Sequence, residues 1–391
     1  MSPKLMVPRA SSARRPPIRL GLLALVCAST VGCAMDLPDP NLIIDHRVLA
    51  IRTAVTMPLV PAEDPQVDLD TPKAQALPFE AVEITPFIVD PEGPVDPDNL
   101  DIVWLACELT PGQGLFACLQ DAMPLALDDI PDCVEPSFAD LMGGALPEIE
   151  TPCLIGREGS PEYTVPLTAN VFIGGGIELT MISGVPDGTS TDDCAREVLR
   201  GEYDLPNDCL VAVQRLDVGP VEQLLILAGD FGVEIPGFEA PDPEDVPEAD
   251  RNPRIAEIRV GQVEDGEQVG DAVVIQPGDQ ISAPLLATLQ VEVDSPEEDL
   301  QTYLIPVNNG ESFEERPEAY QGAWYRTWGK LLSATSDDPS SYNQWLLSPG
   351  EQDEGETPTD DLARMYYVVR DGRQGVNWFW FTVEVTEPVE P

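Results

Sequence analysis

Cysteine placement divides this 391-residue chain into two unlike parts. Beyond Cys33 there are six cysteines, all between residues 107 and 209, whereas residues 210–391 contain none. Residues 236–253, PGFEAPDPEDVPEADRNP, hold five prolines and six acidic residues. A stretch this stiff and charged has little apolar surface to bury, so it predicts a linker. We therefore expect a cysteine-bearing domain at 34–235 and a cysteine-free domain at 254–388.

Residues 1–33 have the profile of a secretory signal peptide. Five basic residues precede an apolar run from Leu20 to Ala28, and no acidic residue occurs before Asp36. That run is shorter than the ~20 residues that cross a bilayer as a helix, and no later segment reaches this length without charges. The chain is therefore expected to be exported, with no segment that spans a membrane as a helix.

The same segment ends in Thr30-Val31-Gly32-Cys33 and resembles the lipobox of bacterial lipoproteins. The resemblance implies that Cys33 receives a lipid, becomes the new N-terminus and anchors the chain in a membrane. Ala34, which follows it, implies sorting to the outer membrane and cell surface. Thr30 stands where the family usually has leucine, which leaves open ordinary signal-peptidase cleavage and a periplasmic or secreted product.

The six remaining cysteines predict disulfide bonds, because exported proteins meet an oxidising environment. Sequence alone does not choose among the pairings. A zinc site is disfavoured, because the chain has no Cys-x-x-Cys pair. The working expectation is closure of successive short loops, pairing Cys107 with Cys118, Cys133 with Cys153, and Cys194 with Cys209.

Net charge excludes one large class of partner. Without residues 1–33 the chain keeps 70 acidic and 16 basic residues, a net charge of −54. Such a surface repels polyphosphate and no basic stripe offsets it, so DNA and RNA are excluded as partners. The apolar content of 43% still allows a buried core.

Short apolar segments predict strands in the first part. Ile102 to Cys107 is apolar at every position, which predicts a central strand covered on both faces. Further on, Thr191 can cap a helix that Gly201 ends. Cys194 would then point inward from this helix, and Cys209 would open the next strand.

The second part alternates more regularly. Residues 288–294 (TLQVEVD) alternate apolar and polar side chains, and residues 365–370 lead through 371–375 (DGRQG) into residues 376–385. This last unit predicts a β-hairpin with glycine where a positive φ is wanted.

Together, a strand after Pro253, the turn PGD at 277–279, an alternating strand ending in Asp294 and the hairpin VVRDGRQGVNWFWFTVEV resemble bacterial immunoglobulin-like domains of the polycystic-kidney-disease (PKD) type. The likeness covers residues 252–388. The first part resembles more loosely the β-sandwich of other bacterial surface lipoproteins, through DPEG before a strand bearing Trp104. The expected fold is mainly β, with two immunoglobulin-like β-sandwich domains in tandem, the first with a cysteine-bearing, partly helical insertion.

Catalytic motifs are absent from the sequence. There is no Gly-x-Ser-x-Gly, His-Glu-x-x-His or phosphate-binding glycine loop, and the lone His46 is expected to be an ordinary strand residue. We therefore expect no enzyme and no cofactor. The alternative, a carboxylate-based extracellular hydrolase, would need a deep pocket with converging acids of raised pKa, which cannot be picked out among 70 acids.

Calcium is the one metal for which the sequence offers candidate ligands, because calcium prefers several oxygen ligands and the chain is rich in carboxylates. The spacing of the acids concerned does not match an EF-hand loop, and a solvated loop is the favoured interpretation. The candidate calcium ligands share one turn-rich stretch: Asp90, Glu92, Asp96, Asp98 and Asp101.

Tryptophan gathers in the second part, which holds five of the six. Alternation along residues 376–385 puts Trp378 and Trp380 on one face of a strand. That face is either covered by residues 323–332, which carry Trp324 and Trp328, or exposed as a platform for a sugar or partner. Coverage is the favoured interpretation.

These observations predict an exported, lipid-anchored surface protein with a structural or interaction role, such as adhesion or scaffolding. Its partner would be a surface protein or a glycan. The alternative is a carbohydrate-binding module that uses exposed Trp378 and Trp380.

Overall fold

We analysed a computed structural model of the chain. It describes residues 39–61, 65–136, 151–172, 175–201, 208–230, 246–307, 312–337, 342–350, 353 and 356–387. The predicted leader with Cys33, and most of the predicted linker, lie outside the described residues. We call residues 39–230 the N-terminal half and residues 246–387 the C-terminal half; both belong to the compact unit Asp39–Pro391.

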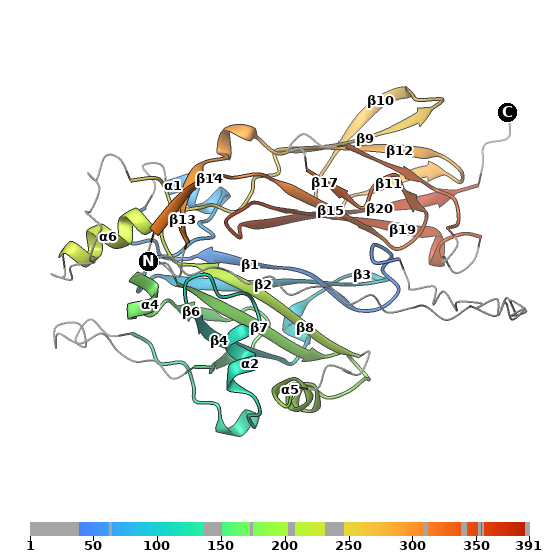
Figure 1. The fold of residues 1–391 in the computed structure, drawn as a ribbon. Helices are drawn as coiled ribbons and strands as arrows, with labels where there is room; N and C mark the ends of the chain where they lie inside the picture. Colours follow the sequence, from blue (N-terminus) through green and yellow to red (C-terminus); the bar gives the residue numbers. More distant parts are fainter. Residues whose placement is uncertain are drawn as a thin grey trace, which may run out of the picture. The chain divides into compact units, whose positions relative to one another are not determined.

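The N-terminal half is a sandwich of two mainly antiparallel sheets (Figure 1). The first sheet has the order β1-β2-β3, with β6 also paired to β2: β1 Arg47–Val55, β2 Ala81–Asp90, β3 Gly93–Val95 and β6 Glu162–Thr164. The second has the order β5-β4-β7-β8: β4 Ile102–Leu109, β5 Cys153–Gly156, β7 Gly176–Gly184 and β8 Cys209–Asp217.

Strand β4 confirms the expectation of a central strand covered on both faces. It pairs with β5 on one side and β7 on the other. Trp104 faces the core between the two sheets, where it meets Ile84 and Met181. Leu105 faces the opposite way, into a second core that helix α5 (Thr191–Leu199) covers with Cys194. An unbroken apolar run fits such a strand because neither face meets water.

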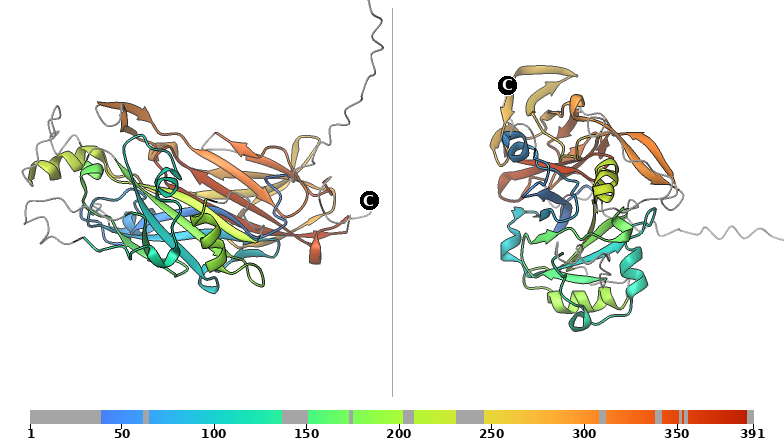
Figure 2. Two further views of the ribbon diagram at one scale, coloured as in Figure 1. Left: turned by 60° about the horizontal axis from the view of Figure 1, so that its bottom comes forward. Right: turned by 90° about the vertical axis from the view of Figure 1, so that its left-hand side faces the viewer.

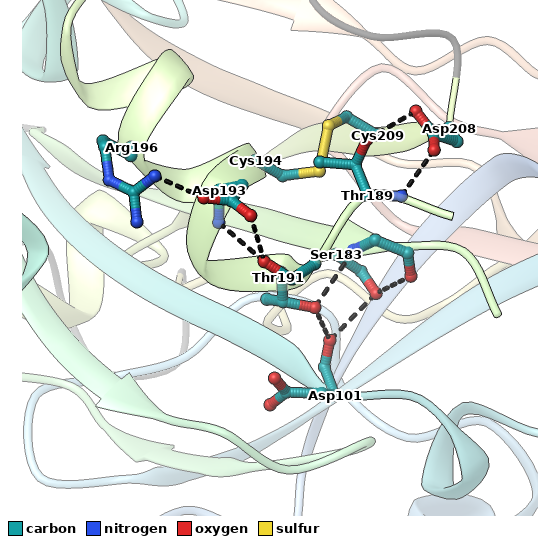
Figure 3. Close-up of a disulfide and its surroundings, with 11 residues drawn as sticks. Asp101, Ser183, Thr189, Thr191, Asp193, Cys194, Arg196, Asp208 and Cys209 are labelled. Carbon is teal, nitrogen blue, oxygen red and sulfur yellow. Dashed lines mark hydrogen bonds and ion pairs between the residues drawn. A yellow bond between two sulfur atoms is a disulfide. The ribbon is translucent and has the colours of Figure 1, made fainter. Parts of the chain in front are cut away.

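Helix α5 begins one residue earlier than predicted, and Figure 3 shows its first turn with Thr191 and Asp193. Ser190, not Thr191, is the N-cap, and its hydroxyl accepts a hydrogen bond from the Asp193 backbone N–H. Thr191 instead donates to the Asp101 carbonyl. Gly201, with φ of +75°, ends the helix as expected.

Outside the two sandwiches, the described part of the chain has four further short helices, four 3₁₀ turns and a small hairpin. They are α1 Pro65–Asp70, α2 Ala117–Ala122, α4 Ala169–Phe172, α6 Val221–Asp230, η1 Pro97–Asn99, η2 Leu127–Asp129, η4 Glu297–Asp299, η6 Thr359–Asp361, and the hairpin of β13 Thr302–Val307 with β14 Ser312–Pro317. None of the helices that the structure describes is both long and apolar enough to cross a membrane.

The C-terminal half is also a sandwich, built from two five-stranded sheets. Its core holds the inward faces of the alternating strands, including Val291, Phe379 and Phe381. One sheet has the order β10-β9-β12-β18-β16: β9 Glu257–Glu264, β10 Glu267–Ile275, β12 Thr288–Asp294, β16 Lys330–Leu331 and β18 Tyr342–Leu346. The other has the order β11-β20-β19-β15-β17: β11 Gln280–Pro284, β15 Gln321–Arg326, β17 Thr335–Ser336, β19 Leu362–Arg370 and β20 Val376–Thr386.

The two sandwiches meet face to face. An apolar cluster joins Leu49 and Phe87 of the first sheet to Tyr366, Val368 and the neighbouring part of the β19–β20 sheet. Figure 2 shows the consequence: the C-terminal half, yellow to red, stacks on the blue strands of the N-terminal half. The fold is thus mainly β, as predicted, with an extensive contact between its halves.

The end of the predicted linker is part of that contact. Asn252 is 4% exposed, and its side-chain amide donates to the carbonyls of Thr53 and Pro72 in the N-terminal half. The side-chain oxygen Oδ1 of Asn252 accepts a hydrogen bond from the Val376 backbone N–H. Asp250 and Asn252 are therefore buried between the halves, although the composition of this stretch is that of an exposed spacer.

Candidate functional site

The four tryptophans weighed as an exposed platform are buried or partly buried. Trp324 and Trp328 are 1% and 2% exposed and belong to the core of the C-terminal sandwich. Trp378 stacks on Phe87, with 4.9 Å between ring centroids and 2° between planes, and the Arg52 guanidinium lies 4.7 Å from the Trp378 ring centroid. The platform interpretation is therefore wrong for these rings.

The expected coverage of Trp378 and Trp380 comes from a different segment than predicted. Both rings pack, partly buried, against the apolar cluster formed with β1 and β2, not against residues 323–332. The latter segment places Trp324 and Trp328 on the opposite face of the sheet. Alternation predicts two faces for β20, but only the contact between the halves decides what covers each.

The candidate calcium ligands do not converge. Asp90 accepts hydrogen bonds from the backbone N–H groups of Glu92 and Gly93, and Asp96 caps η1. Asp101 binds the Arg157 guanidinium. Among the residues that the structure describes, no group of three His, Cys, Asp or Glu side chains is arranged to hold a metal ion.

The other predicted residues, His46 and the disulfide-forming cysteines, take part in contacts within the fold. His46 directly precedes β1, and its Nε2 lies 3.6 Å from an Asp90 carboxylate oxygen. Two expected disulfides are confirmed, Cys133–Cys153 and Cys194–Cys209. Cys107 is also disulfide-bonded, but the side chain of Cys118 lies outside the described residues, so that pairing stays a prediction.

A cavity of about 550 Å³ opens where the two halves meet, and it is the candidate site. This volume falls within the usual range of small-molecule sites. Three segments form its wall: α1 with the residue after it, residues 248–254, and loops of the C-terminal half. Its charged lining residues are seven acids, Asp70, Glu248, Asp250, Glu298, Asp299, Glu318 and Asp371, and two arginines, Arg251 and Arg254.

Asp371 is fixed by the loop between β19 and β20. Its Oδ1 accepts hydrogen bonds from the backbone N–H groups of Arg373 and Gly375, at 2.8 and 2.9 Å. Gln374 adopts the positive φ of +84°, which corrects the expectation that glycine would do so. Gly375 is needed for space instead, because a Cβ there would lie 2.8 Å from the Arg251 carbonyl oxygen.

The side chain of Arg373 connects the loop between β19 and β20 to the N-terminal half. Its side chain is 1% exposed and forms an ion pair with Glu318 at 3.0 Å. A second guanidinium nitrogen donates to Gln75 Oε1, and the guanidinium carbon lies 5.1 Å from the Tyr303 ring centroid. A buried arginine held this way fixes the loop in one position.

Asp250 lies beside this network. Its backbone carbonyl accepts hydrogen bonds from Ala74 and Gln75, and its backbone N–H donates to Gln75 Oε1 at 3.3 Å. Asp250 is one of the residues that line the cavity, and its buried carboxylate atom Oδ2 has no hydrogen-bond partner among the described residues.

The two aspartates have raised pKa values. Burial, with the negative charge of Glu318, raises the pKa of Asp371 to about 7, against the donors that lower it. Burial and the neighbouring Asp371 raise the pKa of Asp250 well above its usual range. Like charges out of water disfavour joint ionisation, so near neutral pH the pair retains a proton.

Sequence reasoning missed these residues for a plain reason. The sequence predicts a turn at Asp371 and a linker in which Asp250 is one of six acids. Neither has a neighbour in the sequence that distinguishes it among 70 acids. Only the packing of residues 246–253 against the β19–β20 loop brings them to one cavity.

No protein-family model matches the chain, and no curated protein matches it. Among solved structures, it is similar to the crystal structure of dimeric latent PorU from Porphyromonas gingivalis, with 12% sequence identity and a TM-score of 0.18. The match covers 88% of this chain and 24% of that one, so this chain spans about a quarter of that structure's length. A likeness this weak indicates neither a shared fold nor a shared function.

Proposed function

We propose that this protein is an exported, lipid-anchored protein of the outer membrane and cell surface that acts by binding a partner. The observation that carries the binding role is the acidic cavity between the halves. Its described lining contains no serine, cysteine or histidine, so it has no Ser–His or Cys–His pair, and its main feature is negative charge. The signal-peptide profile, Cys33 and the disulfides support the exported location.

The immunoglobulin-like, PKD-like assignment of the C-terminal half belongs to the same proposal. Two five-stranded sheets that enclose one core support it. Surface proteins use such sandwiches as rigid supports for binding loops. In this protein the loop is the one between β19 and β20, which borders the cavity with Asp371.

Anchoring is tested by intact-mass analysis of the native protein and by fractionation of cells. Acylation at Cys33 should add the lipid mass and place the protein with the membranes, accessible to protease on intact cells. Cys33→Ser should release it, whereas Cys27→Ser, changed within the leader, should leave it anchored. An unmodified N-terminus near Ala34 in the native protein would overturn the anchor.

Hydrolysis by a pair of carboxyl groups is a second candidate function. The observation that favours it is Asp371, whose pKa of about 7 suits a general acid or base, beside Asp250, whose pKa burial also raises, in a cavity. A panel of glycoside substrates incubated with the purified protein tests it. Turnover that disappears in Asp371→Asn and persists in Asp271→Asn, a change on exposed β10, would support hydrolysis over simple binding.

A further inference from the structure

A buried carboxylate beside the cavity lacks a hydrogen-bond donor. Asp250 is 3% exposed and is one of the residues that line the cavity, and its buried Oδ2 has no hydrogen-bond partner among the described residues. Burying a polar atom without a partner is unfavourable, because the hydrogen bonds it made with water are not replaced. Beside a cavity, a carboxylate in this state favours a ligand that brings hydrogen-bond donors to it.

The arginines near the cavity are already occupied by other acids. Arg251 reaches Asp68 at 2.9 Å, and Arg254 reaches Asp299 at 3.1 Å. Arg373 pairs with Glu318. In the described ion pairs, none of these guanidinium groups binds the side chain of Asp250 or Asp371. The cavity therefore keeps negative charge at this point.

We propose, as an extension of the proposed binding function, that the cavity binds a primary aliphatic amine whose ammonium group donates hydrogen bonds to Asp250 and Asp371. An ammonium group is a compact charge with three donors, which suits acceptors from two separate carboxyl groups. Val67, Pro253 and Tyr320, which also line the cavity, give the alkyl chain an apolar surface.

Other cations fit less well. A divalent metal ion needs several oxygen ligands in one shell, and in the described part of the chain no three His, Cys, Asp or Glu side chains are arranged to hold one. A guanidinium group binds best to both oxygens of one carboxylate. In Asp371, one of the two is already occupied by the N–H groups of Arg373 and Gly375.

Binding should exchange a proton for the amine. The charged groups facing Asp250 are Asp371, Arg373, Glu318 and Asp217, so the single arginine does not neutralise three carboxylates. A proton on the aspartate pair relieves this repulsion in the empty site. An ammonium group can take its place, so the amine should release a proton and bind more tightly as the pH rises.

Isothermal titration of the purified full chain with cadaverine tests the inference. Spermidine and Nα-acetyl-lysine amide serve as separate arms, which distinguish a free polyamine from a lysine side chain. We expect the dissociation constant to fall about tenfold from about pH 6 to about pH 8, with release of up to one proton per site.

Matched variants locate the effect. Asp250→Asn should weaken binding at least about tenfold at about pH 8, because its amide oxygen carries no charge. Asp271→Asn, which changes the net charge equally on exposed β10, should bind within about twofold of the unaltered chain. Thermal unfolding of both variants checks that they are folded.

Three outcomes overturn the inference: no binding of any of the three amines, equal losses in Asp250→Asn and Asp271→Asn, or an affinity that Asp250→Asn leaves unchanged. If no amine binds but Cys33 is acylated in the native protein, the amine-binding inference is rejected and the anchored surface protein is supported. If an amine binds but Cys33 is not acylated, the anchor is rejected and amine binding is supported.

Discussion

The contact between the two halves has two regions of opposite chemistry. One is apolar and aromatic, where Phe87 stacks on Trp378. The other is polar and buried, where Arg373 and Glu318 lie beside Asp371 and Asp250. Apolar burial stabilises a contact at any pH, whereas buried charges stabilise it only while each is compensated. The first region holds the halves together, and the second has room and charge for a ligand.

Replacing Arg373 should have the largest effect on stability. Arg373→Met leaves Glu318, 3% exposed at its side chain, without its cation, and removal of one member of a buried ion pair costs about 3–5 kcal/mol. Unfolding in guanidinium chloride measures the loss. The double variant Arg373→Met, Glu318→Gln should recover part of it. A single variant as stable as the unaltered chain would show that the polar region does not support the contact.

Trp378→Ala should have the next largest effect, at the other region. It removes the stack on Phe87 and the contact with the Arg52 guanidinium, and the ring is partly buried, so we expect a loss of about 3 kcal/mol in the free energy of unfolding. Tyr342→Ala, at a side chain 57% exposed, should change it by less than about 0.5 kcal/mol. If Trp378→Ala and Tyr342→Ala lose similar amounts of unfolding free energy, the apolar region does not stabilise the contact between the halves.

Local patterns in the sequence predicted much of this architecture. The unbroken apolar run of β4 indicated cover on both faces, and the two faces of β20 followed from alternation because side chains in a strand point in turn to opposite sides. Cys194 and Cys209 were paired correctly, since a short helix and the following strand bring them together. These features depend on residues close in the chain.

The contact between the halves could not be predicted in the same way. Trp378 meets Phe87 from a distant strand, and Asn252 joins Thr53 to Val376 although its neighbours have the composition of a linker. The composition of residues 246–253 indicates low apolar content, but backbone and amide hydrogen bonds can pack such a segment without it. The candidate site arises from this packing, so sequence reasoning missed it for the same reason.

The smallest expected effect is a pH dependence confined to the polar region. Burial raises the pKa of Asp371 from 3.8 to about 7, so the protonated form is favoured in the folded state. The resulting stabilisation is fully present below about pH 4 and is lost as the pH rises through about 7. From about pH 5 to about pH 8 it should fall by about 2 kcal/mol, measured as the difference in free energy of unfolding between the unaltered chain and Asp371→Asn.

Asp371→Asn is the sharp comparison because an amide oxygen can still accept from the N–H groups of Arg373 and Gly375, while the ionisable group is gone. The many other acids titrate in both proteins and cancel in the difference, whereas Asp271→Asn reports any effect of net charge alone. If the difference between the unaltered chain and Asp371→Asn is independent of pH, Asp371 does not titrate near neutral pH in the folded protein. The proton exchange proposed for amine binding would then rest on Asp250 alone, whose pKa burial and the neighbouring carboxylates raise.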